Sequence, residues 1–137
     1  VTEGTFVMED TPNIGESMVE NPGIYCKSAN VSVLAANGKT PLITLNQFGA
    51  GKAMYLSSFR VSKESTRFLM RALLTLLGKE DKVRDYICDN LYTECAYYEE
   101  IDKLVVINNS GDTQKTVIKT AKGDVTVELA PFATKIL

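Results

Sequence analysis

A glycine pair directly before a lysine is the first feature of this sequence that could carry chemistry. Gly49, Gly51 and Lys52 lie in the stretch NQFGAGKAMYLSSF, and a glycine-rich loop before a lysine binds phosphate when a helix follows it. A Walker-type loop also needs a glycine and a Ser or Thr at the positions that hold Asn46 and Ala53 here. The residues that follow, KAMYLSS, are typical of a strand, so the pattern predicts a turn rather than a phosphate site.

The three cysteines lack the partner that cysteine chemistry requires. Cys26, Cys88 and Cys95 occur in a chain that contains no histidine, and histidine is the usual base for a cysteine nucleophile and the commonest transition-metal ligand. Their odd number, without CxxC spacing, argues against a disulfide framework or a zinc site. We therefore expect buried free thiols, with no catalytic residue, no metal and no cofactor.

Tyrosines and asparagines of the second half could bind a sugar, because tyrosine rings stack on pyranoses and amides bond to hydroxyl groups. The candidate substrate-binding residues are Tyr97, Tyr98, Asn108 and Asn109, with Tyr92 close to them in the sequence. The alternative interpretation is that alternate tyrosines fill a β-core and the asparagine pair caps a turn.

Arg60, Arg67 and Arg71 form a second candidate surface beside one predicted helix. They could contact carboxylates of a neighbouring domain, or they could be a solvated helix face. The sequence leaves both interpretations open.

Composition argues against several classes of function. Seventeen acidic and fifteen basic residues give a net charge of -2, which disfavours a nucleic-acid partner. No stretch approaches the roughly 18 apolar residues of a membrane span, and the start, VTEGTFVMED, is acidic where a signal peptide is basic and then apolar. We expect a cytoplasmic chain without a membrane partner. It opens on Val1 rather than Met, which suggests a piece of something longer or a processed product.

The elements that position these residues begin with an antiparallel meander. Up to about Gly23 the chain is rich in turn residues, and only Thr5 to Met8 is typical of a strand. Three strands follow, joined by turns at Asn37-Gly38 and at Gly49 to Gly51. Their predicted ranges are Val31 to Ala36, Pro41 to Phe48 and Lys52 to Ser58.

A long amphipathic helix comes next. Ser62 is placed as its N-cap, Glu64 suits the positive end of the helix dipole, and Gly78 suits the stop. The predicted apolar face contains Phe68, Leu69, Ala72, Leu73, Leu76 and Leu77. The predicted opposite side contains Arg67, Arg71 and Thr75.

The second half is predicted to be a small antiparallel β-sandwich, because short β-rich runs recur about every ten residues between turn-like sequences. The runs are Leu91 to Tyr98, Lys103 to Asn108, Lys115 to Thr120, Val125 to Leu129 and Phe132 to Ile136. The expected class is α+β, with domains at residues 1–83 and 84–137.

Three sets of motifs, in their order and spacing, carry a family resemblance that covers the chain from about Ile24 onward. They are Phe48-Gly49 with Gly51-Lys52, Ser65-Thr66-Arg67 with Arg71-Ala72, and Val106 to Asn109 followed by Gln114 and Thr116. In these motifs the chain resembles the lacto-N-biose phosphorylases (1,3-β-galactosyl-N-acetylhexosamine phosphorylases, glycoside hydrolase family 112). The first half resembles the end of their central, amidotransferase-like α/β domain, and the second half their C-terminal β-domain.

The resemblance implies that the chemistry lies outside this chain. Family members carry their catalytic machinery on an N-terminal barrel and use phosphate to split a β-1,3-galactosyl disaccharide into galactose 1-phosphate and an N-acetylhexosamine. None of that barrel is present in these residues, so no catalytic position carries over. Our hypothesis is a non-catalytic scaffold whose partners are the barrel domain and, in a homodimer, a second copy. The alternative is an autonomous carbohydrate-binding or oligomerisation module.

Overall fold

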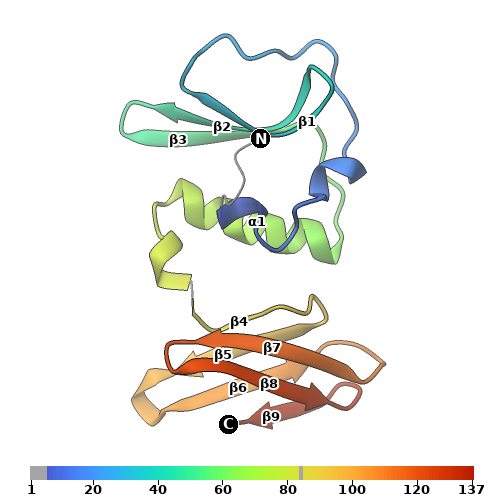
Figure 1. The fold of residues 1–137 in the computed structure, drawn as a ribbon, viewed down its shortest axis with the longest axis vertical. Helices are drawn as coiled ribbons and strands as arrows, with labels where there is room; N and C mark the ends of the chain where they lie inside the picture. Colours follow the sequence, from blue (N-terminus) through green and yellow to red (C-terminus); the bar gives the residue numbers. More distant parts are fainter. Residues whose placement is uncertain (1–5, 84) are drawn as a thin grey trace. The chain divides into compact units, whose positions relative to one another are not determined.

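The computed structural model describes residues 6–83 and 85–137, and the chain forms two compact units that divide between Glu80 and Asp81 (Figure 1). Across these described ranges the strands pair antiparallel and one α-helix is present. These elements confirm the predicted α+β class. No helix in the same ranges has the length and apolar character needed to cross a membrane.

The first unit contains a three-stranded sheet and the α-helix. Two short 3-10 helices come first, η1 (Phe6–Met8) and η2 (Ile14–Ser17). The strands follow in the spatial order β1-β2-β3, and their ranges are β1 (Val31–Asn37), β2 (Thr40–Phe48) and β3 (Gly51–Leu56). Helix α1 (Lys63–Leu76) comes after the sheet, and a further 3-10 helix, η3 (Glu80–Val83), follows in the sequence at the boundary of the two units.

Two-residue loops join these strands. Asn37 pairs with Thr40, and Phe48 pairs with Gly51. Gly38 and Gly49 have φ of 55° and 58°, a conformation that glycine adopts without steric cost. The first turn is therefore Gly38-Lys39, one residue later than predicted, and the second turn is Gly49-Ala50, with Gly51 as the first residue of β3.

Strand β1 is irregular. Its register against β2 shifts between Val33 and Ala35 and again between Ala35 and Ala36, as at a β-bulge, which bends a strand and redirects its side chains. On the facing strand the consecutive residues Leu42 and Ile43 are both buried in one core cluster, whereas a regular strand would send them to opposite faces.

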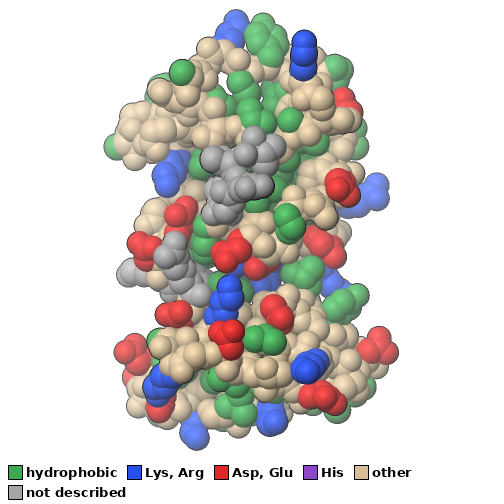
Figure 2. All heavy atoms as spheres, in the orientation of Figure 1, with side chains coloured by type: hydrophobic (Ala, Val, Ile, Leu, Met, Phe, Trp, Pro, Cys, Tyr) green, Lys and Arg blue, Asp and Glu red, His purple; other side chains and the backbone are tan. Residues whose placement is uncertain are grey.

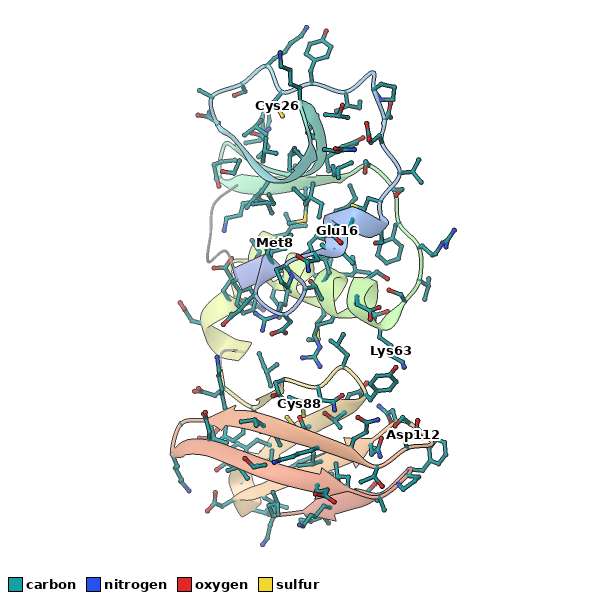
Figure 3. All side chains as sticks on the ribbon, turned by 45° about the vertical axis from the view of Figure 1, so that its right-hand side comes forward. Met8, Glu16, Cys26, Lys63, Cys88 and Asp112 are labelled. Atoms are coloured by element: carbon teal, nitrogen blue, oxygen red, sulfur yellow. The ribbon has the colours of Figure 1, made fainter. Side chains whose placement is uncertain are left out.

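The N-terminal segment completes the core of the first unit. Val7 and Ile14 are buried in the same cluster as Leu34 from β1 and Phe68 from α1, and Figure 3 shows Met8 on η1 beside the helix. The predicted strand from Thr5 to Met8 is wrong, because its described part is a 3-10 helix that packs on α1; Thr5 lies outside the described residues.

Helix α1 begins where the sequence predicts. The Ser65 backbone N–H donates to Ser62 Oγ at 3.1 Å, and the Ser62 N–H donates to Ser65 Oγ at 2.8 Å. This reciprocal pair is a capping box, which satisfies free N–H groups at the helix start. Gly78, with φ of 63°, follows the last turn, as predicted.

The predicted polar face of α1 is wrong. Arg71 and Thr75 are only 3% and 1% exposed, while Met70 and Leu73 are 45% and 51% exposed. The polar stripe is buried because the N-terminal segment covers it and supplies carboxylates to its arginines. An apolar stripe of Leu69, Met70, Leu73 and Leu77 consequently stays exposed.

The second unit consists of two three-stranded antiparallel sheets, ordered β4-β7-β8 and β5-β6-β9. The strands are β4 (Ile87–Cys88), β5 (Thr93–Tyr98), β6 (Lys103–Asn108), β7 (Gln114–Thr120), β8 (Gly123–Leu129) and β9 (Thr134–Ile136), with a 3-10 helix η4 (Glu99–Ile101) after β5. Both sheets contribute to one core: Val106 comes from one sheet, and Ile118 and Val127 from the other. Strand β4 was not predicted, because two residues are too few to show a period.

Candidate functional site

An enclosed charged cluster lies where the N-terminal segment meets α1. Arg71 Nε donates to Asp10 Oδ2 at 2.7 Å, and its Nη1 donates to Glu9 Oε2 at 3.1 Å and to the Phe6 carbonyl at 2.9 Å. The guanidinium also lies over the Phe6 ring, 4.4 Å from its centroid. Arg67 joins the cluster through Asp10 at 3.4 Å.

This cluster fastens the N-terminal segment to the helix. A buried guanidinium needs hydrogen bonds in its plane, and Arg71 obtains them from groups of its own unit. Two of the three predicted surface arginines, Arg67 and Arg71, therefore contact carboxylates of their own chain. These carboxylates belong to Glu9 and Asp10. Arg60 is exposed and forms no part of the cluster.

The Lys52 ammonium is bonded within its own unit, just after a turn at Gly49-Ala50. This ammonium donates to the Thr75 carbonyl at 3.2 Å, in the last turn of α1, where a positive charge is favourable. Strand β3 begins at Gly51, where a phosphate loop requires a helix.

Asn108, a predicted sugar ligand, is 1% exposed and is bonded within the second unit. Its Nδ2 donates to the carbonyls of Asp112 at 2.7 Å and Ala130 at 2.9 Å. Its Oδ1 accepts from the backbone N–H and the hydroxyl of Ser110, both at 2.9 Å. These bonds join β6, the loop after it and the loop after β8. The Asn108 side chain therefore stabilises the fold of this unit.

Tyr97 is held at the other end of β5 and β6. Its hydroxyl donates to Asp102 Oδ1 at 2.7 Å, and its ring stacks on Tyr86 with centroids 4.1 Å apart and 4° between planes. The Tyr97 hydrogen bond, and then Lys122, lower the pKa of Asp102 below its ordinary value. The same carboxylate raises the pKa of the Tyr97 hydroxyl above its ordinary value.

The four predicted sugar-binding residues do not form one surface. Tyr97 pairs with Leu104 and Tyr98 with Lys103, whereas Asn108 pairs with Thr93 at the opposite end of the two strands. Five residues along a strand correspond to about 16 Å. Tyr98 is 50% exposed and Asn109 is exposed, while Tyr97 packs against the core. The alternation of side chains along β6 could have predicted that Asn108 is buried, because Asn108 lies on the same face of the strand as the buried Leu104 and Val106.

Only one of the three cysteines is buried. Cys88 is buried, Cys95 is half-buried with its Sγ 3.0 Å from the Tyr86 carbonyl, and Cys26 is exposed in the loop before β1 (Figure 3). The expectation that all three are buried is therefore wrong for Cys26. Over the part of the chain that the structure describes, no three His, Cys, Asp or Glu side chains are grouped as a metal site requires.

Three polar oxygens on or beside the β2–β3 pair are buried without a hydrogen-bond partner: Asn46 Oδ1, the Tyr55 hydroxyl and Ser57 Oγ. Asn46 and Tyr55 lie on the same face, because Tyr55 pairs with Thr44, two residues before Asn46. Ser57 continues the ladder through its N–H to the Leu42 carbonyl at 2.8 Å. Buried oxygens of this kind accept bonds from water.

A cleft of about 490 Å³ lies beside β1 and η2 in the same unit. Leu34 and Leu42 supply apolar walls, and Glu16 and Glu20 supply carboxylates. The Asn37 amide donates to Glu20 across it. Figure 2 shows basic and acidic side chains interspersed on the visible face.

Comparison with known families divides the chain within a few residues of the boundary between its two units. Residues 1–81 match the family model described as the lacto-N-biose phosphorylase central domain. Residues 86–137 match the model described as the lacto-N-biose phosphorylase C-terminal domain.

Individual relatives agree with these matches. The chain is 35% identical, over 83% of its length, to a D-galactosyl-β-1→4-L-rhamnose phosphorylase of Lachnoclostridium phytofermentans. It is 31% identical, over 86% of its length, to a 1,3-β-galactosyl-N-acetylhexosamine phosphorylase of the same organism. It is 32% identical, over 72% of its length, to a 1,3-β-galactosyl-N-acetylhexosamine phosphorylase of Bifidobacterium longum subsp. longum.

The matched region is a small share of each relative, namely 16%, 16% and 13% of their lengths in the same order. The two family models together cover nearly the whole chain, in the order central domain and then C-terminal domain. The chain therefore belongs to the lacto-N-biose phosphorylase family.

Proposed function

We propose that this chain is a non-catalytic scaffold, formed by the end of an amidotransferase-like central domain and a C-terminal β-sandwich. The parent activity would be a phosphorylase that cleaves β-1,3-galactosyl-N-acetylhexosamine with phosphate to galactose 1-phosphate and N-acetylhexosamine. The observation that carries the proposal is the tiling of the chain by the central and C-terminal family models.

The polar groups of the described residues support a structural role. Arg71 is bonded to the N-terminal segment, Asn108 joins strand β6 to two loops, and Lys52 is bonded to the end of α1. Each group is used to hold its own unit together, and the partner that we expect for the scaffold is the barrel domain of a phosphorylase.

Phosphorolysis assays test this proposal. The purified chain, given lacto-N-biose and phosphate, should release no galactose 1-phosphate, while the Bifidobacterium longum relative serves as the positive control. A chimera of that relative, with this chain in place of its matching region, should fold and retain phosphorolysis. Turnover by the chain alone, or a chimera that folds but is inactive, would contradict the scaffold role.

A carbohydrate-binding module is the alternative, and the half-exposed ring of Tyr98 is the observation that favours it. Calorimetry with galactose, N-acetylglucosamine and lacto-N-biose separates the two functions. Binding in the millimolar range or tighter that is lost in Tyr98→Ala supports the module, and no heat supports the scaffold.

A further inference from the structure

Two aromatic residues and an amide lie together at one end of the β5-β6-β9 sheet. The Asn109 N–H donates to the Tyr92 carbonyl at 2.8 Å, which continues the pairing of β5 with β6. On the other side of β6, the Phe132 N–H donates to the Ser110 carbonyl at 3.0 Å. We call Tyr92, Asn109 and Phe132 the aromatic bracket, because Asn109 follows the middle strand and the aromatic residues flank it.

The residues of the aromatic bracket are open to solvent. Thr93 and Asn108 pair with each other and are only 0% and 1% exposed, so their neighbours Tyr92 and Asn109 point to the outer face of the sheet. Tyr92 is 42% and Phe132 is 71% exposed, and Asn109 is exposed. Since β5 and β9 lie on either side of β6, the backbones of the two aromatic residues are about 10 Å apart, which is two strand spacings.

The backbone of Phe132 adopts a conformation that is unfavourable for a bulky residue. Its φ is 54°, in the left-handed region where a side chain crowds the neighbouring carbonyl. Burial of the ring does not offset this strain, because the ring is largely exposed. A methyl group at Gly111 would lie 3.7 Å from the edge of the ring, so the ring is held beside the loop that carries Asn109. Strained residues of this kind cluster at ligand-binding sites.

An exposed amide between two exposed rings matches the chemistry of a neutral sugar. The C–H face of a pyranose stacks on an aromatic ring, and an amide can both donate to and accept from hydroxyl groups. Asp112 is exposed in the same loop, at the end of the second unit that Figure 3 labels. Its carboxylate can accept a hydroxyl hydrogen bond, and its charge disfavours a phosphorylated sugar at the same place.

We propose that the aromatic bracket binds a neutral pyranose unit. The site is distinct from the Tyr98 surface, because Tyr98 lies at the opposite end of the β5–β6 pair. It does not depend on the scaffold role, which the chimera decides. An open site buries much less of its ligand than a pocket does, so the dissociation constant should be in the tens of millimolar. Such binding is weaker than the binding that would identify a carbohydrate-binding module by calorimetry.

Nuclear magnetic resonance of the ¹⁵N-labelled chain tests the proposal, with lacto-N-biose as the probe. The amide signals of Tyr92, Asn109, Gly111 and Phe132 should shift and approach saturation as the sugar is added, while those of Tyr98 stay in place. Sorbitol is the control ligand, since it carries hydroxyl groups but no ring face, and its shifts should not saturate. The absence of saturable shifts, or shifts centred on Tyr98, would overturn the proposal.

Substitutions identify the groups that bind. Phe132→Leu keeps an apolar side chain but removes the flat ring, and it should raise the dissociation constant at least fivefold. Tyr92→Ala and Asn109→Ala should also weaken binding. The matched control is Tyr98→Ala, which removes an equally exposed ring elsewhere on the same sheet and should alter the constant less than twofold. The spread of the amide signals shows that each variant is folded. Binding that Phe132→Leu and Tyr92→Ala both leave unchanged would place the sugar elsewhere and overturn the proposal.

Discussion

Asn108 holds three segments of the second unit together through one amide group. Its side chain bonds to carbonyls of two loops and to Ser110, and all of these bonds lie where water has little access because the residue is 1% exposed. Removal of a buried amide leaves its former partners without hydrogen bonds, which costs more than the bonds contribute net.

Asn108→Ala should lower the free energy of unfolding of the second unit by about 3 kcal/mol. Chemical denaturation followed by circular dichroism measures the change. The neighbouring variant Asn109→Ala is the control and should change the free energy by less than about 0.5 kcal/mol, since its side chain is exposed. Equal effects of the two variants would contradict the role that the structure gives to Asn108.

The Tyr97–Asp102 pair should give stability a dependence on pH. The pKa of Asp102 is lowered in the folded chain, so its contribution is present above the ordinary carboxyl pKa of about 4 and is lost as the pH falls through the lowered value. The pKa of Tyr97 is raised, so its contribution is present below about pH 10 and is lost as the pH rises through the raised value.

Tyr97→Phe should therefore flatten the acid side of the stability profile. Urea unfolding of the wild type, Tyr97→Phe and Tyr98→Phe between about pH 2 and 6 measures this. Tyr98→Phe should follow the wild type, because no bond joins its hydroxyl to Asp102. Parallel acid slopes for the wild type and Tyr97→Phe would show that the hydrogen bond does not survive in solution.

Helix α1 depends on a buried cation rather than on an apolar stripe alone. Arg71→Met should destabilise the first unit by about 3 kcal/mol, because it leaves Glu9 and Asp10 without their buried partner. Arg60→Met removes an exposed arginine just before the helix and should have little effect. Thermal unfolding of both variants checks the expectation; a neutral Arg71→Met would mean that the N-terminal segment is held by its apolar contacts.

The elements of this chain are predictable from sequence where local chemistry decides them. Ser62 and Gly78 mark the ends of α1 because capping depends on the nearest residues. The buried face of α1 is not predictable in this way, since Arg71 looks like a solvated residue until Glu9 and Asp10 are brought beside it. The sequence of Phe6 to Met8 likewise predicts a strand where the chain forms a 3-10 helix, because apolar character alone does not distinguish a strand from a short helical turn.

The predicted sugar-binding residues show even more clearly that local sequence does not reveal which side chains become neighbours. Tyr97, Tyr98, Asn108 and Asn109 are close in the sequence and of suitable chemistry, but the hairpin of β5 and β6 places the tyrosines and the asparagines at opposite ends. Register decides which residues of a sheet are neighbours, and composition carries no information on register. The family resemblance, by contrast, rests on ordered motifs and is confirmed by the two family matches.

At the scale of the whole molecule, the chain has two separate cores, one around Ile43 and Phe68 and one around Val106 and Ile118. Each unit should therefore unfold as its own cooperative transition. Calorimetry should resolve two heat-absorption peaks, with Arg71→Met lowering one and Asn108→Ala lowering the other. A single peak that both variants shift together would show that the cores unfold as one.

The irregular pairing of β1 has a consequence for how this sheet meets other chains. An exposed edge strand can pair with a strand of another chain and so start fibril growth. A bulged edge strand is a poor template for such pairing. The two register shifts between Val33 and Ala36 lie in β1, an edge strand of this sheet. This edge is therefore protected against aggregation. Removal of the register shifts from β1 would accordingly lower the solubility of the chain.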